Sequence, residues 1–279
     1  MHKTVQDIIK MKNEKKKISV ITSYDYTLAS LCDKAGIDVL LVGDSAGMVM
    51  LGYENTIPVT MDQMCMFTEA VSRGRKDSLL VSDLPFMSYQ ASIEDAINNS
   101  GRLIKAGADA VKLEGGSIMA ETISAIVDVG IPVMGHIGLQ PQTTMLSEGY
   151  KVQGKTKDSA MKLIEDAKEL EDAGVFSIAL EMVSHEVAQI ISETVSVPVI
   201  GIGSGVNCDG QVLVVQDLLG MYDKIKPKFA KRYMNLSEDI IKSLENYRSD
   251  VESGDFPTKE NSFSMNEEEL KKLREQLGS

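Results

Sequence analysis

The chain has 279 residues and is 43% hydrophobic, so it can bury a large core as one α/β barrel or as two smaller domains. Its formal net charge of −12, its 5% aromatic content and its lack of Trp argue against nucleic-acid binding, which depends on phosphate neutralisation and base stacking. No apolar run approaches the roughly 20 residues needed to cross a bilayer, and residues 1–17 lack the apolar core of a signal peptide.

The cysteines, Cys32, Cys65 and Cys208, are odd in number and widely spaced. This pattern indicates neither a disulfide framework nor a zinc site, and we expect a cytoplasmic protein in a reducing compartment with no membrane contact. Basic residues cluster between Lys10 and Lys17, where we expect a solvated face rather than a binding patch.

Strand-like runs alternate with helical patterns up to about residue 220. Each predicted strand is a short, largely apolar segment, as in buried parallel sheets. In chain order the predicted strands are 18–23, 39–43, 79–82, 110–113, 133–135, 177–180, 199–202 and 211–215. The predicted helices between them are 26–35, 60–72, 92–106, 118–129, 160–173 and 187–194.

Local signals mark several element boundaries. Thr60 and Ser92 are typical N-cap residues, and Gly36 follows a predicted helix where a left-handed residue commonly ends one. Two long loops, 44–58 and 137–158, each follow a predicted strand.

The sequence predicts about eight strands that alternate with helices. Eight is the number of strands that closes a (β/α)₈ TIM barrel of about 250 residues. A doubly wound open sheet shows the same alternation and is the competing architecture. We favour the barrel because polar residues end most of the strands, and a barrel gathers these ends on one face. Helices predicted over 237–251 and 266–276 complete a single TIM-barrel domain over 1–279, with the barrel at about 18–220 and a C-terminal helical extension at about 221–279.

Three apolar runs close on an acid, at Asp44, Asp83 and Glu114. One such acid alone is more often the N-cap of the next helix, but three at a common sheet edge would form a hard-cation site. Because only oxygen donors are offered, without a His or Cys pair, the set favours Mg²⁺, with Mn²⁺ possible and zinc disfavoured.

Other strand ends carry candidate reactive groups. Lys112 lies two residues before Glu114, so strand alternation predicts that both face the barrel interior, although a Lys extending outward is the alternative. Glu181 has no basic neighbour in sequence and suits a general base for a carbon acid, or else it caps the next helix. His136 is either a structural histidine or part of the shared site face. The glycines of 201–205 indicate a phosphate loop or simply tight turns.

Six motifs, in order along the chain, closely resemble those of the ketopantoate hydroxymethyltransferase family, and the resemblance runs from about residue 4 to 263. The motifs are Val42-Gly-Asp-Ser45, Asp83-Leu-Pro-Phe86, Val111-Lys-Leu-Glu-Gly-Gly116, Gly135-His-Ile-Gly138, Gly149-Tyr-Lys-Val-Gln-Gly154, and Gly201-Ile-Gly-Ser-Gly205 with Cys208-Asp-Gly-Gln211.

The resemblance implies a TIM-barrel enzyme that transfers a hydroxymethyl group from 5,10-methylenetetrahydrofolate to 3-methyl-2-oxobutanoate through a Mg²⁺-stabilised enolate. The product is 2-dehydropantoate, for pantothenate biosynthesis. It also implies a homodecamer. The residues that match the family's functional positions are Asp44, Asp83 and Glu114 for the metal, Asp44, Ser45, Asp83, Lys112 and His136 for substrate, and Glu181 as the catalytic proton acceptor.

The chain departs from the family pattern in the loop after His136. It reads Gly138-Leu-Gln-Pro-Gln142 where members often have Thr in place of Gln140, and Ser147-Glu148 replaces a more usual glycine-containing pair. These changes could alter folate affinity or loop mobility.

Two rival functions would also explain the acids. One is a Mg²⁺-dependent bond-cleaving enzyme of the phosphoenolpyruvate mutase and isocitrate lyase type, against which the motif at Lys151–Gly154 weighs. The other is a non-catalytic oxo-acid-binding barrel, which the presence of every candidate catalytic side chain disfavours.

Overall fold

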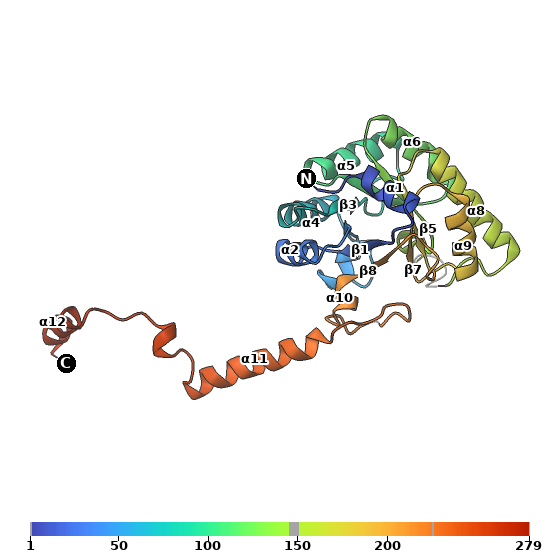
Figure 1. The fold of residues 1–279 in the computed structure, drawn as a ribbon. Helices are drawn as coiled ribbons and strands as arrows, with labels where there is room; N and C mark the ends of the chain where they lie inside the picture. Colours follow the sequence, from blue (N-terminus) through green and yellow to red (C-terminus); the bar gives the residue numbers. More distant parts are fainter. Residues whose placement is uncertain (1, 145–150, 225, 279) are drawn as a thin grey trace.

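The computed structural model describes residues 2–144, 151–224 and 226–278 (Figure 1). Within these ranges, eight parallel strands close a barrel in sequence order, which confirms the predicted TIM barrel and excludes the open sheet. The strands are β1 (Ile18–Thr22), β2 (Val39–Val42), β3 (Leu79–Asp83), β4 (Ala110–Glu114), β5 (Val133–Gly138), β6 (Ser177–Glu181), β7 (Val199–Ile202) and β8 (Gly210–Leu213).

Helices surround the barrel and extend beyond it (Figure 1). They are α1 (Val5–Asn13), α2 (Tyr26–Lys34), α3 (Ala46–Val49), α4 (Met61–Gly74), α5 (Ile93–Lys105), α6 (Ala120–Asp128), α7 (Pro141–Thr144), α8 (Lys157–Asp172), α9 (His185–Thr194), α10 (Val215–Leu218), α11 (Leu236–Ser253) and α12 (Glu267–Leu277), with 3₁₀ turns at Ser117–Met119 and Lys259–Asn261.

The structure confirms the helix-boundary residues that the sequence predicts. Thr60 and Ser92 are N-caps whose hydroxyls accept hydrogen bonds from the backbone N–H groups of Gln63 and Asp95, at 3.3 and 3.0 Å. Gly36 follows α2 with a φ of 80°, the predicted left-handed conformation.

Strand β5 is longer than the sequence predicts, reaching Gly138 rather than Gly135. Glycine disfavours strands locally, but pairing with β6 places Gly138 beside Glu181 and extends the strand. A Cβ atom at Gly138, whose φ is 95°, would lie 2.2 Å from the carbonyl oxygen of Glu181. Only glycine therefore allows β5 to approach the end of β6 this closely.

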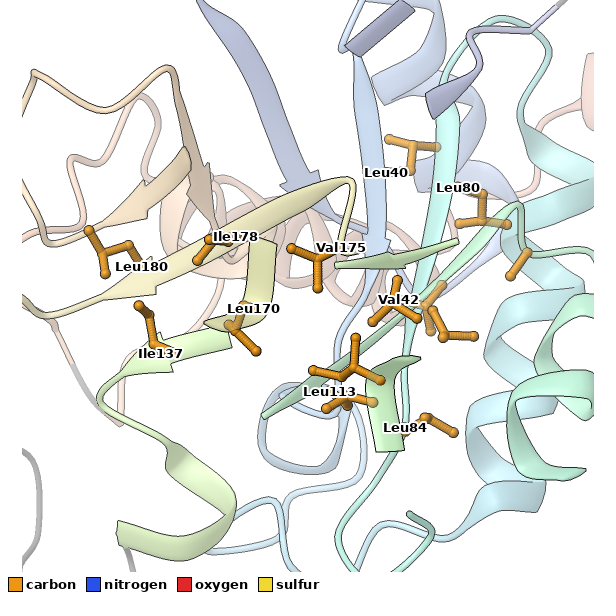
Figure 2. Packing of buried hydrophobic residues seen from close by; sticks show 14 of the residues in the cluster. Leu40, Val42, Leu80, Leu84, Leu113, Ile137, Leu170, Val175, Ile178 and Leu180 are labelled. Carbon is orange, nitrogen blue, oxygen red and sulfur yellow. The ribbon is translucent and has the colours of Figure 1, made fainter. Parts of the chain in front are cut away.

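Apolar side chains alternate between two layers. One set faces the helices, including Leu40, Leu113 and Ile178 in the close view of Figure 2. The alternate residues, such as Leu41 and Met134, belong to a second cluster. Strand residues in register with the second cluster point into the barrel interior. Near the C-terminal ends of the strands, such residues form the site.

The prediction that the Lys10–Lys17 cluster is a solvated face is wrong for Lys12. Its ammonium group donates to the carbonyls of Ser192, Val195 and Val197, each at 2.9 Å, and lies 2.9 Å from Asp209. Helix α1 packs its buried Ile8 on the second cluster. The amphipathic packing of α1 thus carries one lysine to carbonyl groups around the end of α9, a tertiary contact that local charge does not reveal.

The C-terminal helices differ from the rest of the molecule. Figure 1 shows α11 and α12 extending away from the barrel, and neither helix has a buried residue. The three cysteines are free thiols, in agreement with the sequence prediction. Among the helices that the structure describes, none combines the length and apolar character required to span a membrane.

Candidate active site

One cavity of about 390 Å³ opens at the C-terminal ends of the strands and collects every site residue predicted from the sequence. Its lining includes Asp44, Ser45, Asp83, Lys112, Glu114, His136 and Glu181. These residues are spread over nearly 140 positions of sequence, and they meet because a parallel barrel delivers its strand ends to one face.

Strand register sets which of these residues are neighbours. Asp83 on β3 is opposite Lys112 on β4, and Glu114 is opposite His136 on β5. Lys112 and Glu114 both line the cavity, so the inward alternation predicted for β4 is confirmed.

Lys112 and Asp83 form a buried ion pair, with 2.5 Å between the ammonium nitrogen and Oδ1. Burial opposes the charge on Lys112, but the fields of Asp83, Glu114 and Asp44 outweigh it and raise the pKa of the lysine. The lysine therefore remains a fixed positive charge in the cavity.

The charged forms of the two remaining acids of this cluster, Asp44 and Glu114, are disfavoured. Burial, followed by repulsion from Asp83, raises the pKa of Asp44 to about 7. Burial, followed by repulsion from Asp44, raises the pKa of Glu114 well above its usual value. A single buried ammonium does not balance three clustered carboxyl groups, so this end of the cavity is suited to an added cation.

Gln142, on α7, connects Asp44 with Glu114 and was missed by the sequence reasoning. Its side-chain amide donates to Asp44 Oδ2 and to the Leu84 carbonyl, each at 2.9 Å, and its backbone N–H donates to Glu114 Oε2 at 3.1 Å. The amide oxygen accepts from the Tyr89 hydroxyl at 2.8 Å. The sequence signals were its position in the loop that follows a site strand and its place in the segment Gly138–Gln142 that was compared with the family pattern.

Tyr24 was also missed. Its hydroxyl lies 2.8 Å from Ser45 Oγ, and the ring is almost completely buried. Tyr24 follows the end of β1, so the shared sheet edge that identified the acids could have identified it too. This contact holds the Ser45 hydroxyl in place beside Asp44.

His136 lies between two carboxylates. Its Nδ1 is 3.6 Å from Glu114 Oε1, and its Nε2 is 3.4 Å from Glu181 Oε2. Among the described residues neither ring nitrogen has a hydrogen-bond partner, although His136 is buried. Both nitrogens are therefore available to a ligand or water in the cavity.

Glu181 stands apart from Asp44, Asp83 and Glu114, at the end of β6. It is less buried than they are, with its side chain 15% exposed. The next residue, Met182, has a φ of 48°, which is strained for a bulky side chain. Such strain is common where the backbone must place a functional group, and here it occurs where the strand delivers Glu181 to the cavity.

The donor set fits Mg²⁺. In the described ranges no three His, Cys, Asp or Glu side chains converge closely enough to enclose a metal by themselves. Mg²⁺ does not require such a cage, because it usually binds one or two carboxylates and completes its shell with water and substrate oxygens. The clustered acids with raised pKa values supply the oxygen donors and the negative charge for it.

Gln140, one of the departures from the family motifs, lies outside these contacts. Gln140 does not line the cavity, and its carbonyl accepts a hydrogen bond from the Thr143 N–H at 3.1 Å. Ser147 and Glu148 lie outside the described residues.

Solved structures with the same fold include a phosphonopyruvate hydrolase in complex with oxalate and Mg²⁺. It superposes with a TM-score of 0.61 at 9% identity, covering 99% of this chain and 95% of that one. A phosphoenolpyruvate phosphomutase from Streptomyces platensis subsp. rosaceus has a TM-score of 0.60 at 12% identity, covering 99% and 96%. At these identities the likeness establishes the fold alone.

Sequence relatives are much closer. The chain is 88% identical to a 3-methyl-2-oxobutanoate hydroxymethyltransferase from Nitrosopumilus maritimus, and the alignment covers the full length of both proteins. The enzyme of that name from Cenarchaeum symbiosum is 61% identical, covering 89% of this chain and 94% of the relative. The model of the ketopantoate hydroxymethyltransferase family matches residues 2–259. On this match and these identities, the chain belongs to the ketopantoate hydroxymethyltransferase family.

Proposed function

We propose that this transferase moves a hydroxymethyl group from 5,10-methylenetetrahydrofolate to 3-methyl-2-oxobutanoate, forming 2-dehydropantoate for pantothenate biosynthesis. The observation that carries the proposal is a single cavity that holds a cluster of buried acids, the buried Lys112 and, separately, the carboxylate of Glu181. Membership of the family supports the same reaction.

Asp44, Asp83 and Glu114 are the residues that would hold Mg²⁺. When bound, the cation supplies Lewis-acid stabilisation of the negative charge that develops on the oxo acid as its C3 proton leaves. The ion pair between Lys112 and Asp83 places a second positive charge at the same end of the cavity.

Glu181 is the proposed proton acceptor at C3 of the oxo acid. The C3–H electron pair becomes the enolate of the substrate, which forms a C–C bond to the methylene carbon of the folate. Both C–N bonds of that carbon, to N5 and N10, break, and the oxygen of water becomes the product hydroxyl. The two folate nitrogens take up the C3 proton held by Glu181 and one proton from water, so that tetrahydrofolate leaves. Lys112 offsets charge on the substrate oxygens, while Ser45 and His136 offer hydrogen bonds. The cavity holds both reactants in near-attack geometry.

The decisive experiment is a coupled assay for 2-dehydropantoate with and without a chelator. Product should require oxo acid, methylenetetrahydrofolate and Mg²⁺ together. A product formed without folate would favour the bond-cleaving rival. No turnover above buffer at saturating substrates and Mg²⁺ would favour a non-catalytic oxo-acid-binding barrel.

A cytoplasmic homodecamer is also proposed for the working enzyme. Three free thiols are in keeping with a reducing compartment. Exposed apolar residues on the C-terminal arm, α11 and α12, support contact with other copies, and they include Ile241, Leu244, Tyr247 and Leu277. Sedimentation of the full chain should give the decamer mass, and removal of residues 235–279 should reduce it; a monomeric full chain would contradict the assembly.

A further inference from the structure

The cavity has two chemically different halves. The clustered acids, Lys112, His136 and Glu181 come from the ends of β2 to β6, whereas the opposite wall, called here the apolar half, carries Val20, Ile200, Ile202, Val212 and Val214. Two further charged residues, Asp217 and Lys228, line the cavity from the segment after β8. A volume of about 390 Å³ lies in the range of pockets that enclose drug-sized ligands. Because the clustered charged groups occupy one end, the other end has room for the larger reactant.

Phe229 lines the cavity and packs against Gly203, which follows β7. A Cβ atom at Gly203, which has a φ of 66°, would lie 3.0 Å from Cδ1 of Phe229 and 3.4 Å from Cγ of Met182. The phenyl ring therefore packs on bare glycine backbone after β7, close to the residue that follows Glu181. A Gly203 side chain would push the ring out of this position.

The segment that carries Phe229 is anchored to the protein. Arg232 donates to the Tyr222 carbonyl at 2.8 Å and to Asp223 at 3.1 Å, and the Tyr233 N–H donates to the Leu218 carbonyl on α10 at 2.9 Å. Tyr222 also lines the cavity. Two aromatic side chains are thus held at the wall by fixed backbone contacts.

Asp217, on α10, is the acid that stands among these aromatic and aliphatic residues. It is half-buried and lines the cavity, and within the described part of the chain its carboxyl group has no hydrogen-bond donor. Burial raises the pKa of Asp217, and the charge of Arg232 opposes this shift. A partly desolvated carboxylate without donors is a group suited to a ligand that brings N–H donors.

We propose that the apolar half binds the pterin ring of the folate donor, with Asp217 accepting hydrogen bonds from the 2-amino group and N3–H of the ring. This inference rests on the proposed function. Two adjacent N–H donors match the two oxygens of one carboxylate, and the flat bicyclic ring suits packing against Phe229 and Tyr222. The donor edge is at the opposite end of the ring system from N5, so N5 and its methylene carbon face Glu181 and the charged half.

The test measures tetrahydrofolate binding to the full-length, Mg²⁺-loaded protein by calorimetry. Asp217→Asn, which replaces one carboxylate acceptor with a donor, should raise the Kd at least tenfold and the KM for methylenetetrahydrofolate similarly. Phe229→Leu should raise the Kd at least threefold. Asp172→Asn is the matched control, because it makes the same change at an exposed aspartate at the end of α8, outside the cavity and away from the segment that carries Phe229, and its Kd should stay within twofold of the wild type.

Deuterium exchange at C3 of the oxo acid, which needs no folate, separates this inference from the proposed function. In Asp217→Asn, the rate of hydroxymethyl transfer at limiting folate should fall by a factor at least ten times larger than the rate of deuterium exchange, each relative to the wild type. A Kd within twofold of the wild type in Asp217→Asn, an equal loss in Asp172→Asn, or a wild type that does not bind tetrahydrofolate would overturn the subsite. A wild type that binds tetrahydrofolate through Asp217 but forms no 2-dehydropantoate would refute the function and leave the subsite standing. If Asp217→Asn does not fold, Phe229→Leu decides, and an unchanged Kd there overturns the subsite.

Discussion

The ammonium group of Lys112 lies 2.5 Å from the Asp83 carboxylate, and both residues are almost completely buried. This pair fixes one positive charge among three carboxyl groups. The two members of this ion pair are not equivalent. Asp83 is one of three acids near Lys112, whereas Lys112 is the cation that all three acids share.

Removing Lys112 should therefore destabilise the protein more than removing the charge of Asp83. Lys112→Met leaves three clustered acids unopposed, and we expect a loss of about 3–5 kcal/mol in the free energy of unfolding, as for other broken buried pairs. Asp83→Asn leaves Lys112 near Asp44 and Glu114 and should cost less. Urea unfolding of both variants and the double variant measures this, and equal losses would contradict the argument. Added Mg²⁺ should partly rescue Lys112→Met.

The pKa of Asp44 predicts an unusual pH dependence in the metal-free protein. Its folded value of about 7 exceeds the reference value of 3.8, so between these values the folded state binds more protons than the unfolded state. The contribution of Asp44 to stability is therefore lost as pH rises from about 4 to about 7, at up to about 1.4 kcal/mol per pH unit. Asp44→Asn should flatten this slope, and Mg²⁺ should offset the loss. A slope that is unchanged in the variant would refute the assignment.

Glu181→Gln should abolish proton exchange at C3 while sparing binding. Loss of a general base typically costs 10²–10⁴-fold, so deuterium wash-in into 3-methyl-2-oxobutanoate should fall at least 100-fold. The Kd values for Mg²⁺ and the oxo acid should remain within a few-fold, because Glu181 lies apart from the proposed metal ligands. Fast wash-in in this variant would show that another group is the base.

Gln142 should matter for the geometry of the acids. Gln142→Ala removes the donor to Asp44 and one of the two acceptors of the Tyr89 hydroxyl, the Glu114 carbonyl being the other. The lost donor to the buried Asp44 should cost about 1–3 kcal/mol of stability. Gln142→Glu adds a further carboxyl group beside Asp44 and should be more harmful at pH 8 than at pH 5. Thermal unfolding at both pH values checks this, with Gln140→Glu, outside the cavity, as the control.

The sequence by itself determined the barrel and most of the site. Apolar runs ending at Asp44, Asp83, Glu114 and Glu181 were sufficient, because parallel strands in a closed barrel present their ends on one face. Inward alternation on β4 likewise follows from the period of a strand, so Lys112 and Glu114 could be placed together without coordinates.

Only the tertiary structure decided how far β5 extends, where Lys12 binds, and which residues hold the acids. Gly138 enters β5 through pairing with Glu181, and Gln142 reaches Asp44 from a loop almost a hundred residues away. No local pattern encodes such contacts, because hydrogen-bond partners across a barrel depend on strand register and loop path rather than on neighbouring residues. Periodicity therefore gives the face on which a residue lies, and packing gives its partner.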